Sequence, residues 1–189
     1  RVESSLVQKL KEVAGAENST LFMLVLAIYH LWLSRLSDQE EIAIGTPVNG
    51  RYHPDTEHIM GMFVNTLVLR NALKKEETFR ELLKMVREST LNAFENQAYP
   101  FENLVEKILT TRDTSRNPLF DVWFLFQNSN WQSIEVPGLS VEPIPIVNTA
   151  AKVDLAVKVS EEGDSLALNF DFATQLFKKE TIEKWAGYF

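Results

Sequence analysis

The chain contains no cysteine, and this absence removes a whole group of chemistries. Without thiols there are no disulfides, no thiolate nucleophile and no cysteine-ligated zinc or iron–sulfur site. The absence is compatible with a reducing cytoplasm, and we expect the protein to work in that compartment.

Glycine is scarce too, with seven residues in a chain of 189. The Gly-x-Ser-x-Gly turn of serine hydrolases, the P-loop of nucleotide hydrolases and the Gly-x-Gly-x-x-Gly motif of dinucleotide sites do not occur in the sequence. The sequence therefore gives no support to these three enzyme classes.

Basic residues are fewer than acidic ones: the chain has 19 Lys and Arg but 26 Asp and Glu, which gives a net charge of −7. Such a balance leaves no electrostatic footprint for nucleic acid or an anionic membrane, and we expect neither as a partner. The most apolar stretch, 21–33, contains His30 and is shorter than the roughly 20 residues of a membrane span. We interpret it as a buried helix.

The size and the apolar content suit a packed domain. A chain of 189 residues with 45% hydrophobic content can form one domain or half of a larger two-lobed one. The chain begins at Arg1 rather than at a methionine, and Phe189 falls inside a helical pattern. We therefore expect it to be a segment cut from a longer polypeptide.

Apolar periodicity predicts helices and strands that are mixed along the chain. Helices are predicted over 2–14, 21–36 and 79–95, after Pro100, and from 178 onward. Strands are predicted over 41–48, 62–69 and 119–126, and over 153–159 and 166–172, which form a hairpin. The proline-punctuated segment 131–149 is predicted to be a loop with an edge strand. This mixture predicts a layered α/β fold.

The three histidines offer little chemistry on their own. His53 and His58 enclose Asp55 and Glu57 in a polar loop, where a solvated loop is the better interpretation than a metal site. His30 lies in the apolar helix, and we expect a hydrogen-bonded core histidine there rather than a catalytic one. We predict no metal.

Several polar side chains stand in apolar strands or rigid turns, where they must find partners or cost free energy. They are Arg51, Asn65, Arg112, Asp113, Arg116 and Asn117. Physical reasoning alone favours an internal brace over the wall of a binding site.

Four segments resemble motifs of nonribosomal peptide synthetase condensation domains, in the order that the family has. Residues 45–51 (GTPVNGR) resemble G-x-P-V-x-G-R, and 60–70 (MGMFVNTLVLR) resemble I-G-x-F-V-N-T-x-x-x-R. Residues 96–102 (NQAYPFE) resemble N/H-Q-D-Y-P-F-E, with Ala98 in place of the aspartate, and 112–119 (RDTSRNPL) match R-D-x-S-R-N-P-L in full.

The resemblance implies that residues 1–189 are the C-terminal subdomain of a condensation domain. We expect an α/β two-layer sandwich lobe that resembles the C-terminal half of a chloramphenicol acetyltransferase-like (CoA-dependent acyltransferase) fold. Such domains form peptide bonds between acyl and aminoacyl thioesters on carrier proteins. Their chemistry centres on a His-His-x-x-x-Asp-Gly motif in the first lobe, which this chain lacks. We therefore expect no catalytic residue in the fragment and no activity from it alone.

The resemblance also implies roles and partners. Arg51 would pair with the aspartate of the first-lobe motif and Asn65 would lie near the substrate tunnel, while the loop with Arg112, Asp113, Arg116 and Asn117 would brace the next strand. No cofactor is expected to bind directly, because phosphopantetheine arrives on peptidyl carrier proteins. Further expected partners are the N-terminal lobe of the same domain and an adjacent adenylation domain.

In this family, a segment of the second lobe crosses over to the sheet of the first. Residues 147–168 are the candidate here. Without the first lobe, such a strand exposes backbone edges, so we expect a swapped or edge-paired homodimer, or a disordered crossover, in isolation.

Two other interpretations stay open. An epimerization or cyclization half-domain would use the same fold, although the full R-D-x-S-R-N-P-L match and Val64-Asn65-Thr66 favour condensation. A non-catalytic module that only docks carrier proteins is the alternative from another functional class.

Overall fold

The structure is a computed structural model that describes residues 1–51, 53–109, 116–127, 138–139 and 150–189. Five strands form one sheet: β1 (Glu41–Val48), β2 (Asn65–Ala72), β3 (Val122–Gln127), β4 (Leu155–Glu162) and β5 (Ser165–Phe172). The helices are α1 (Ser4–Ala16), α2 (Leu21–Ser37), α3 (Phe79–Glu95), α4 (Phe101–Ile108) and α5 (Lys179–Ala186), with a short 3-10 helix, η1 (Pro54–Thr56).

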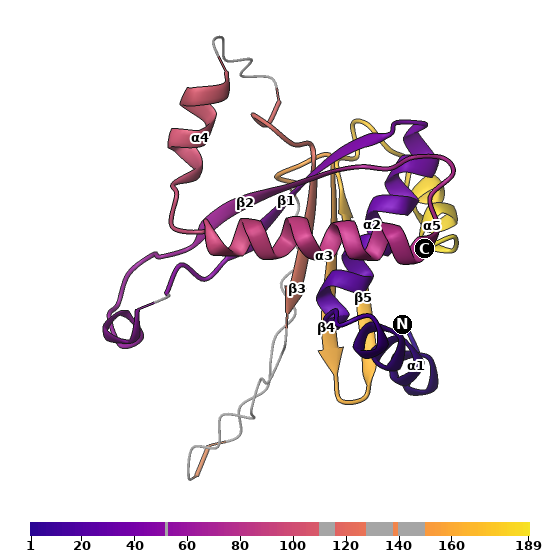
Figure 1. Cartoon of the computed structure of the whole chain (residues 1–189), viewed down its shortest axis with the longest axis horizontal. Helices are drawn as coiled ribbons and strands as arrows, with labels where there is room; N and C mark the ends of the chain where they lie inside the picture. The colour runs from indigo at the N-terminus through magenta and orange to yellow at the C-terminus, as the bar shows by residue number, and fades with distance from the viewer. Residues whose placement is uncertain (52, 110–115, 128–137, 140–149) are drawn as a thin grey trace.

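The sheet is mixed, in the order β2-β1-β3-β4-β5 (Figure 1). The outer pairs β1–β2 and β4–β5 are antiparallel, and the inner pairs β1–β3 and β3–β4 are parallel. The register pairs Gly45 with Trp123 and Trp123 with Ala156, so these residues share one face of the sheet.

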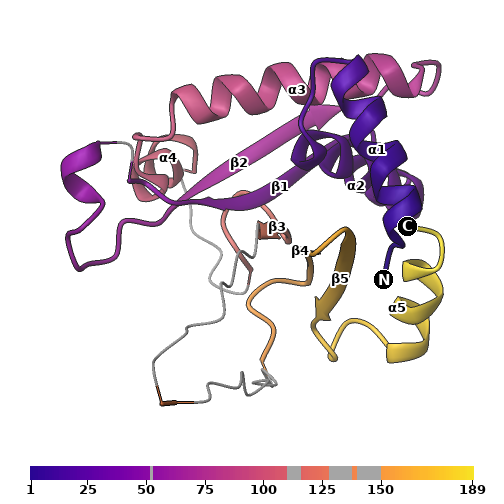
Figure 2. The ribbon, with the colours of Figure 1, turned by 90° about the horizontal axis from the view of Figure 1, so that it is seen from below.

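The helices α1, α2 and α3 lie on one side of the sheet, and α5 lies beside β5 (Figure 2). The buried residues Ile44, Leu69, Phe124 and Val157 belong to the core that these helices cover. The predicted layered α/β fold and its helices are therefore confirmed.

The helix α2 is the centre of the core, as its nearly continuous apolar sequence predicts. Tyr29 and Leu26 are 0% exposed, and Trp32 donates a hydrogen bond from Nε1 to the carbonyl oxygen of Trp185 in α5 at 3.0 Å. Phe189 packs edge-on against both Tyr29 and Trp32. Aromatic contacts thus join α2 to the C-terminal end of the chain.

The predicted hydrogen-bonded core histidine is confirmed. His30 in α2 is 0% exposed, and the amide nitrogen of Asn71 in β2 lies 3.0 Å from its Nε2. The two side chains therefore share a hydrogen bond in the core between α2 and β2. Burial lowers the pKa of His30 to about 3, so the ring is neutral at pH 7.

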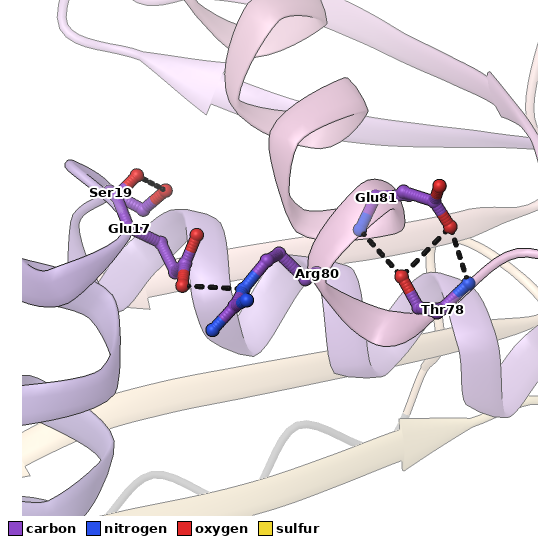
Figure 3. Close-up of polar contacts among 5 residues, drawn as sticks. All are labelled: Glu17, Ser19, Thr78, Arg80 and Glu81. Atoms are coloured by element: carbon purple, nitrogen blue, oxygen red, sulfur yellow. Dashed lines mark hydrogen bonds and ion pairs between the residues drawn. The ribbon is translucent and has the colours of Figure 1, made fainter.

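A capping box begins α3, as the Thr78–Glu81 spacing predicts (Figure 3). Thr78 accepts a hydrogen bond from the backbone N–H of Glu81, and Glu81 accepts one from the backbone N–H of Thr78 at 2.8 Å. The backbone N–H of Thr78, and then its hydroxyl, donate to the carboxylate of Glu81 and lower its pKa. One residue away, Arg80 donates to Glu17 beyond the end of α1 at 2.8 Å, which links the two helices.

Two strands start later than the sequence predicts. The strand predicted over 62–69 is β2, Asn65–Ala72, and the strand predicted over 119–126 is β3, Val122–Gln127. In the second case, Leu119 has a φ of 98° and cannot continue extended backbone.

The expected crossover segment lies only partly in the described residues, which begin again at 150. From there, β4 pairs on one edge with β3 and on the other with β5, all within this chain. The crossover of residues 147–168 to another lobe stays a prediction, and β4 would have to give up one of these ladders to take part in it.

Among the described residues, no single helix is both long and apolar enough to span a membrane. The helices α1 and α2 meet that criterion only as a pair, and the chain bends by 99° between them.

Candidate functional site: four motif segments in one cluster

The four motif segments of the sequence contact one another directly in the fold, as far as the structure describes them. We call this set the motif cluster: residues 45–51, 60–70, 96–102 and 116–119. Residues 45–51 contact 60–70, residues 60–70 contact 96–102, and Phe120, directly after 116–119, contacts both 96–102 and 45–51.

The first link joins residues 45–51 to residues 60–70 through an arginine and a glycine. The guanidinium of Arg51 lies over the ring of Phe63, 4.2 Å from its centroid, and donates to the carbonyl oxygen of Gly61 at 3.1 Å and to that of Thr56. Gly50 has a φ of 66°, and a Cβ there would overlap the carbonyl oxygen of Phe63. Only glycine suits both the conformation and the space.

The second link joins residues 60–70 to residues 96–102 through one amide side chain. Asn65 donates from Nδ2 to the carbonyl oxygens of Gln97 and Tyr99, both at 2.8 Å. Its Oδ1 accepts from the backbone N–H of Thr66 at 2.9 Å and of Phe101 at 3.2 Å. Asn65 thus fixes the start of β2 to the connection between α3 and α4.

The third and fourth links are apolar and meet at Phe120, the residue after the R-D-x-S-R-N-P-L match. Its ring lies 5.8 Å from that of Phe101 and 5.4 Å from that of Trp123. A Cβ on Gly45 would clash with the Phe120 ring, so β1 needs glycine where this ring packs against it. Phe120 therefore connects segments 96–102 and 45–51 to β3.

Arg116 and Asn117 brace the starts of two parallel strands. Arg116 forms an ion pair with Asp121, with Nε 3.2 Å from Oδ1, and Asn117 donates to the carbonyl oxygen of Lys152 at 3.0 Å. Burial, and then the nearby Asp121, raise the pKa of Asp154, while Arg116 lowers it. Arg112 and Asp113 lie outside the described residues.

The motif cluster holds backbone in place, and its described residues bring no catalytic pair together. His53 accepts a hydrogen bond from the backbone N–H of Asp55 at 3.3 Å and so caps η1. No group of three or more His, Asp or Glu side chains among the described residues could hold a metal ion. These hydrogen bonds and ring contacts fix the positions of backbone segments, which is the role of a structural support rather than of a catalytic centre.

Sequence reasoning did not single out three residues in or beside the cluster: Phe63, Phe120 and Asp121. Phe63 is the phenylalanine of the resembled F-V-N-T motif, and Phe120 directly follows the R-D-x-S-R-N-P-L match, but both are apolar and look like ordinary core residues. The acidic partner of Arg116 could have been found, because Asp121 follows it by five residues across the turn at Pro118 and Leu119.

Comparison with known proteins agrees with the motifs. The family model described as Condensation domain matches residues 1–189. The chain belongs to the Condensation domain family. The predicted resemblance is therefore confirmed at the level of the family.

Curated relatives are nonribosomal peptide synthetases of bacteria. Tyrocidine synthase 3 of Brevibacillus parabrevis is 46% identical over 184 residues, which are 97% of this chain and 3% of that protein. Gramicidin S synthase 2 of Brevibacillus brevis is 48% identical over 185 residues, which are 97% of this chain and 4% of that protein. The chain thus spans a small part of the length of these relatives.

Solved structures confirm the predicted acyltransferase-like α/β fold of condensation domains. A four-domain nonribosomal peptide synthetase bound to AMP and glycine has a TM-score of 0.89 at 25% identity, over 98% of this chain and 15% of that one. The condensation domain of the Monacolin K polyketide synthase MokA has a TM-score of 0.88 at 19% identity, over 100% of this chain and 44% of that one.

Proposed function

We propose that residues 1–189 are the second lobe of a peptide-bond-forming condensation domain, inactive without the first lobe. The single observation that carries the proposal is the motif cluster, in which segments with family motifs bind one another while no His-His pair occurs in the sequence. A chain that covers 44% of a condensation-domain structure supports the same division into lobes.

In this proposal, the lobe contributes one wall of a tunnel. The amine of an aminoacyl thioester attacks the carbonyl carbon of the donor thioester. The C–N bond forms, the C–S bond breaks, and the proton lost by the amine ends on the phosphopantetheine thiol of the released donor carrier. Arg51 pairs with an aspartate of the first-lobe motif, and Asn65 keeps β2 and the α3–α4 connection in register beside the substrates. The described part of the next motif, Arg116 and Asn117, holds the starts of β3 and β4.

The partners follow from this role. The lobe works with the N-terminal lobe, with peptidyl carrier proteins that bring phosphopantetheine arms, and with an adjacent adenylation domain, in the cytoplasm. Positioning of two tethered reactants supplies much of the catalysis in such a site, since effective molarities of aligned groups are large.

We further propose that the isolated lobe forms an edge-paired homodimer. The outer edge of β5 carries one isolated bridge among the described residues, between Val2 and Leu166. An open strand edge is a template for another strand. Light scattering after size exclusion should show twice the monomer mass, and a monomer across the concentration range would contradict this proposal.

The test of the enzyme is reconstitution. The first lobe is supplied as a second chain, and dipeptide formation between two loaded carrier proteins is measured. We expect product with wild type, loss of product with Arg51→Ala, and no loss with the control Arg35→Ala, because Arg35 is exposed on α2. No product despite a demonstrated complex of the lobes would contradict the proposal.

A docking module is the second candidate, and one observation favours it. The X-domain from teicoplanin biosynthesis has a TM-score of 0.86 at 25% identity, over 98% of this chain and 43% of that one. The same domain has been solved in complex with OxyB, with a TM-score of 0.82. Carrier-protein binding without product in the reconstitution would support this function.

A further inference from the structure

Residues 49 and 50 are the only Asn-Gly pair in the sequence. Asn49 is exposed and directly follows the last residue of β1, Val48. Gly50 has a φ of 66°, and its N–H donates to no backbone carbonyl among the described residues. The backbone nitrogen of Gly50 is therefore not engaged in the sheet, although the strand ends only two residues before it.

An asparagine side chain and the backbone nitrogen of the next residue can react with each other. When the nitrogen of Gly50 attacks the side-chain carbonyl carbon Cγ of Asn49, the new C–N bond closes a five-membered succinimide ring. The bond from Cγ to the amide nitrogen breaks, and this nitrogen leaves as ammonia with the proton that Gly50 loses. A side chain on the second residue hinders the attack and restricts the backbone, and glycine has none.

Water then opens the succinimide at one of its two carbonyl carbons. One opening gives aspartate in an unchanged backbone. The other gives isoaspartate, in which the backbone runs from Cα through Cβ and Cγ to the nitrogen of residue 50 and so gains one atom. Both products carry a carboxylate in place of a neutral amide, and neither step needs any reagent except water.

The turn that contains this pair has little room for a longer backbone. A Cβ on Gly50 would overlap the carbonyl oxygen of Phe63, so the two backbones are in close contact. One residue later, the guanidinium of Arg51 binds the carbonyl oxygens of Thr56 and Gly61 and lies over the Phe63 ring. These partners belong to other segments, and they stay in place when the turn changes.

We propose that Asn49 is a site of spontaneous deamidation, and that its isoaspartyl product releases Arg51 from these partners. The first step follows from the exposed Asn-Gly pair and the unengaged nitrogen of Gly50. The second follows from the extra backbone atom, which shifts Gly50 and Arg51 against the fixed carbonyl oxygens. The inference concerns the chain itself and does not depend on the proposed function.

Incubation of the chain at mildly alkaline pH, followed by peptide mass spectrometry, tests the first step. The peptide that contains Asn49 should change from amide to acid about tenfold faster than the peptide that contains Asn18, which is also exposed outside the helices but precedes Ser19. The rate at Asn49 should rise with pH, because the deprotonated backbone nitrogen is the nucleophile.

Isoaspartate is identified by enzymatic labelling. A protein isoaspartyl O-methyltransferase with labelled S-adenosylmethionine should label the aged chain at residue 49. Asn49→Gln is the control variant and should lose this label, because glutamine would have to close a larger ring. Equal rates at Asn49 and Asn18, or an aged chain without label at residue 49, would overturn the proposal.

Hydrogen exchange tests the release of Arg51. The isoaspartyl form is separated from the unmodified chain by its additional negative charge. The amides of Thr56, Glu57 and Ile59 are hydrogen-bonded in turns that Arg51 braces, and they should exchange several-fold faster in the isoaspartyl form.

The variant Asn49→Asp carries the new charge without the extra backbone atom, and it should exchange like the unmodified chain. Equal exchange in the isoaspartyl and unmodified forms would overturn the release of Arg51. Equally fast exchange in Asn49→Asp and the isoaspartyl form would overturn the role of the extra atom and assign the effect to the charge.

Discussion

The side chain of Asn65 donates a hydrogen bond to the carbonyl oxygen of Tyr99, at 2.8 Å, and so ties one family motif to the backbone of another. The same amide also binds Gln97 and Phe101, which uses the donor and acceptor sides of the group together. Few side chains can replace it, because only an amide offers both functions at this size. Asn65 is therefore the central polar residue of the motif cluster.

Asn65→Ala should lower the free energy of unfolding by about 2 kcal/mol, because the partly buried carbonyl of Gln97 and N–H of Phe101 lose their partner, whereas the exposed carbonyl of Tyr99 can bind water instead. Asn65→Asp has nearly the same shape but presents a carboxylate to two carbonyl oxygens, and it should destabilise as well. Urea unfolding measures both changes. The control Asn103→Ala, at an exposed residue of α4, should stay within about 0.5 kcal/mol of wild type.

The helices and strands could be predicted from the sequence because apolar periodicity indicates them, and the motif segments because they are patterns of nearby residues. It did not predict the partners of Asn65, since three of them are backbone atoms of Gln97, Tyr99 and Phe101 and backbone atoms have no residue signature. The sheet order could not be predicted either. Whether β1 lies beside β3 depends on contacts between segments that are far apart in the sequence.

Gly50 and Gly163 both have a positive φ, but they differ in the space around them, so alanine at each position distinguishes backbone strain from steric overlap. Gly50 and Gly163 have φ values of 66° and 60°, but an added Cβ would overlap the carbonyl oxygen of Phe63 at the first and meet nothing within 4 Å at the second. Gly163→Ala should cost about 1 kcal/mol for the left-handed backbone alone. Gly50→Ala should cost clearly more in the same urea titration, and equal losses would contradict the packing role of Gly50.

Arg116→Ala should raise the pKa of Asp154 further, because the arginine is the group that lowers it. A carboxyl whose folded pKa is raised favours the protonated form, so its contribution to stability is present at low pH and lost as pH rises through that pKa. In Arg116→Ala, the stability that Asp154 contributes should be lost at a higher pH than in wild type, because its folded pKa is higher. Carbon-detected NMR titration of Asp154 measures the change, and an unaltered midpoint would contradict the electrostatic link.

Arg116 shows what could and could not be predicted from the sequence. The pattern of polar residues in a rigid turn correctly drew attention to Arg116 and Asn117. The identity of their partners depended on Asp121 and Lys152, which the turn and the parallel pairing of β3 with β4 bring near. The local sequence showed only that Arg116 and Asn117 need partners. Which partners they have depends on strand pairing between segments that are distant in the sequence.

His30 should make the protein sensitive to acid. Burial lowers its pKa to about 3 in the folded state, against about 6.5 when unfolded, so unfolding takes up a proton between these values. The free energy of unfolding should be highest above pH 6.5 and fall by at most about 1.4 kcal/mol per pH unit toward pH 3. His30→Gln can still bind Asn71 and should flatten this dependence in urea titrations at successive pH values. The exposed control His58→Gln should leave it unchanged, and an equally steep profile in His30→Gln would assign the acid sensitivity to other groups.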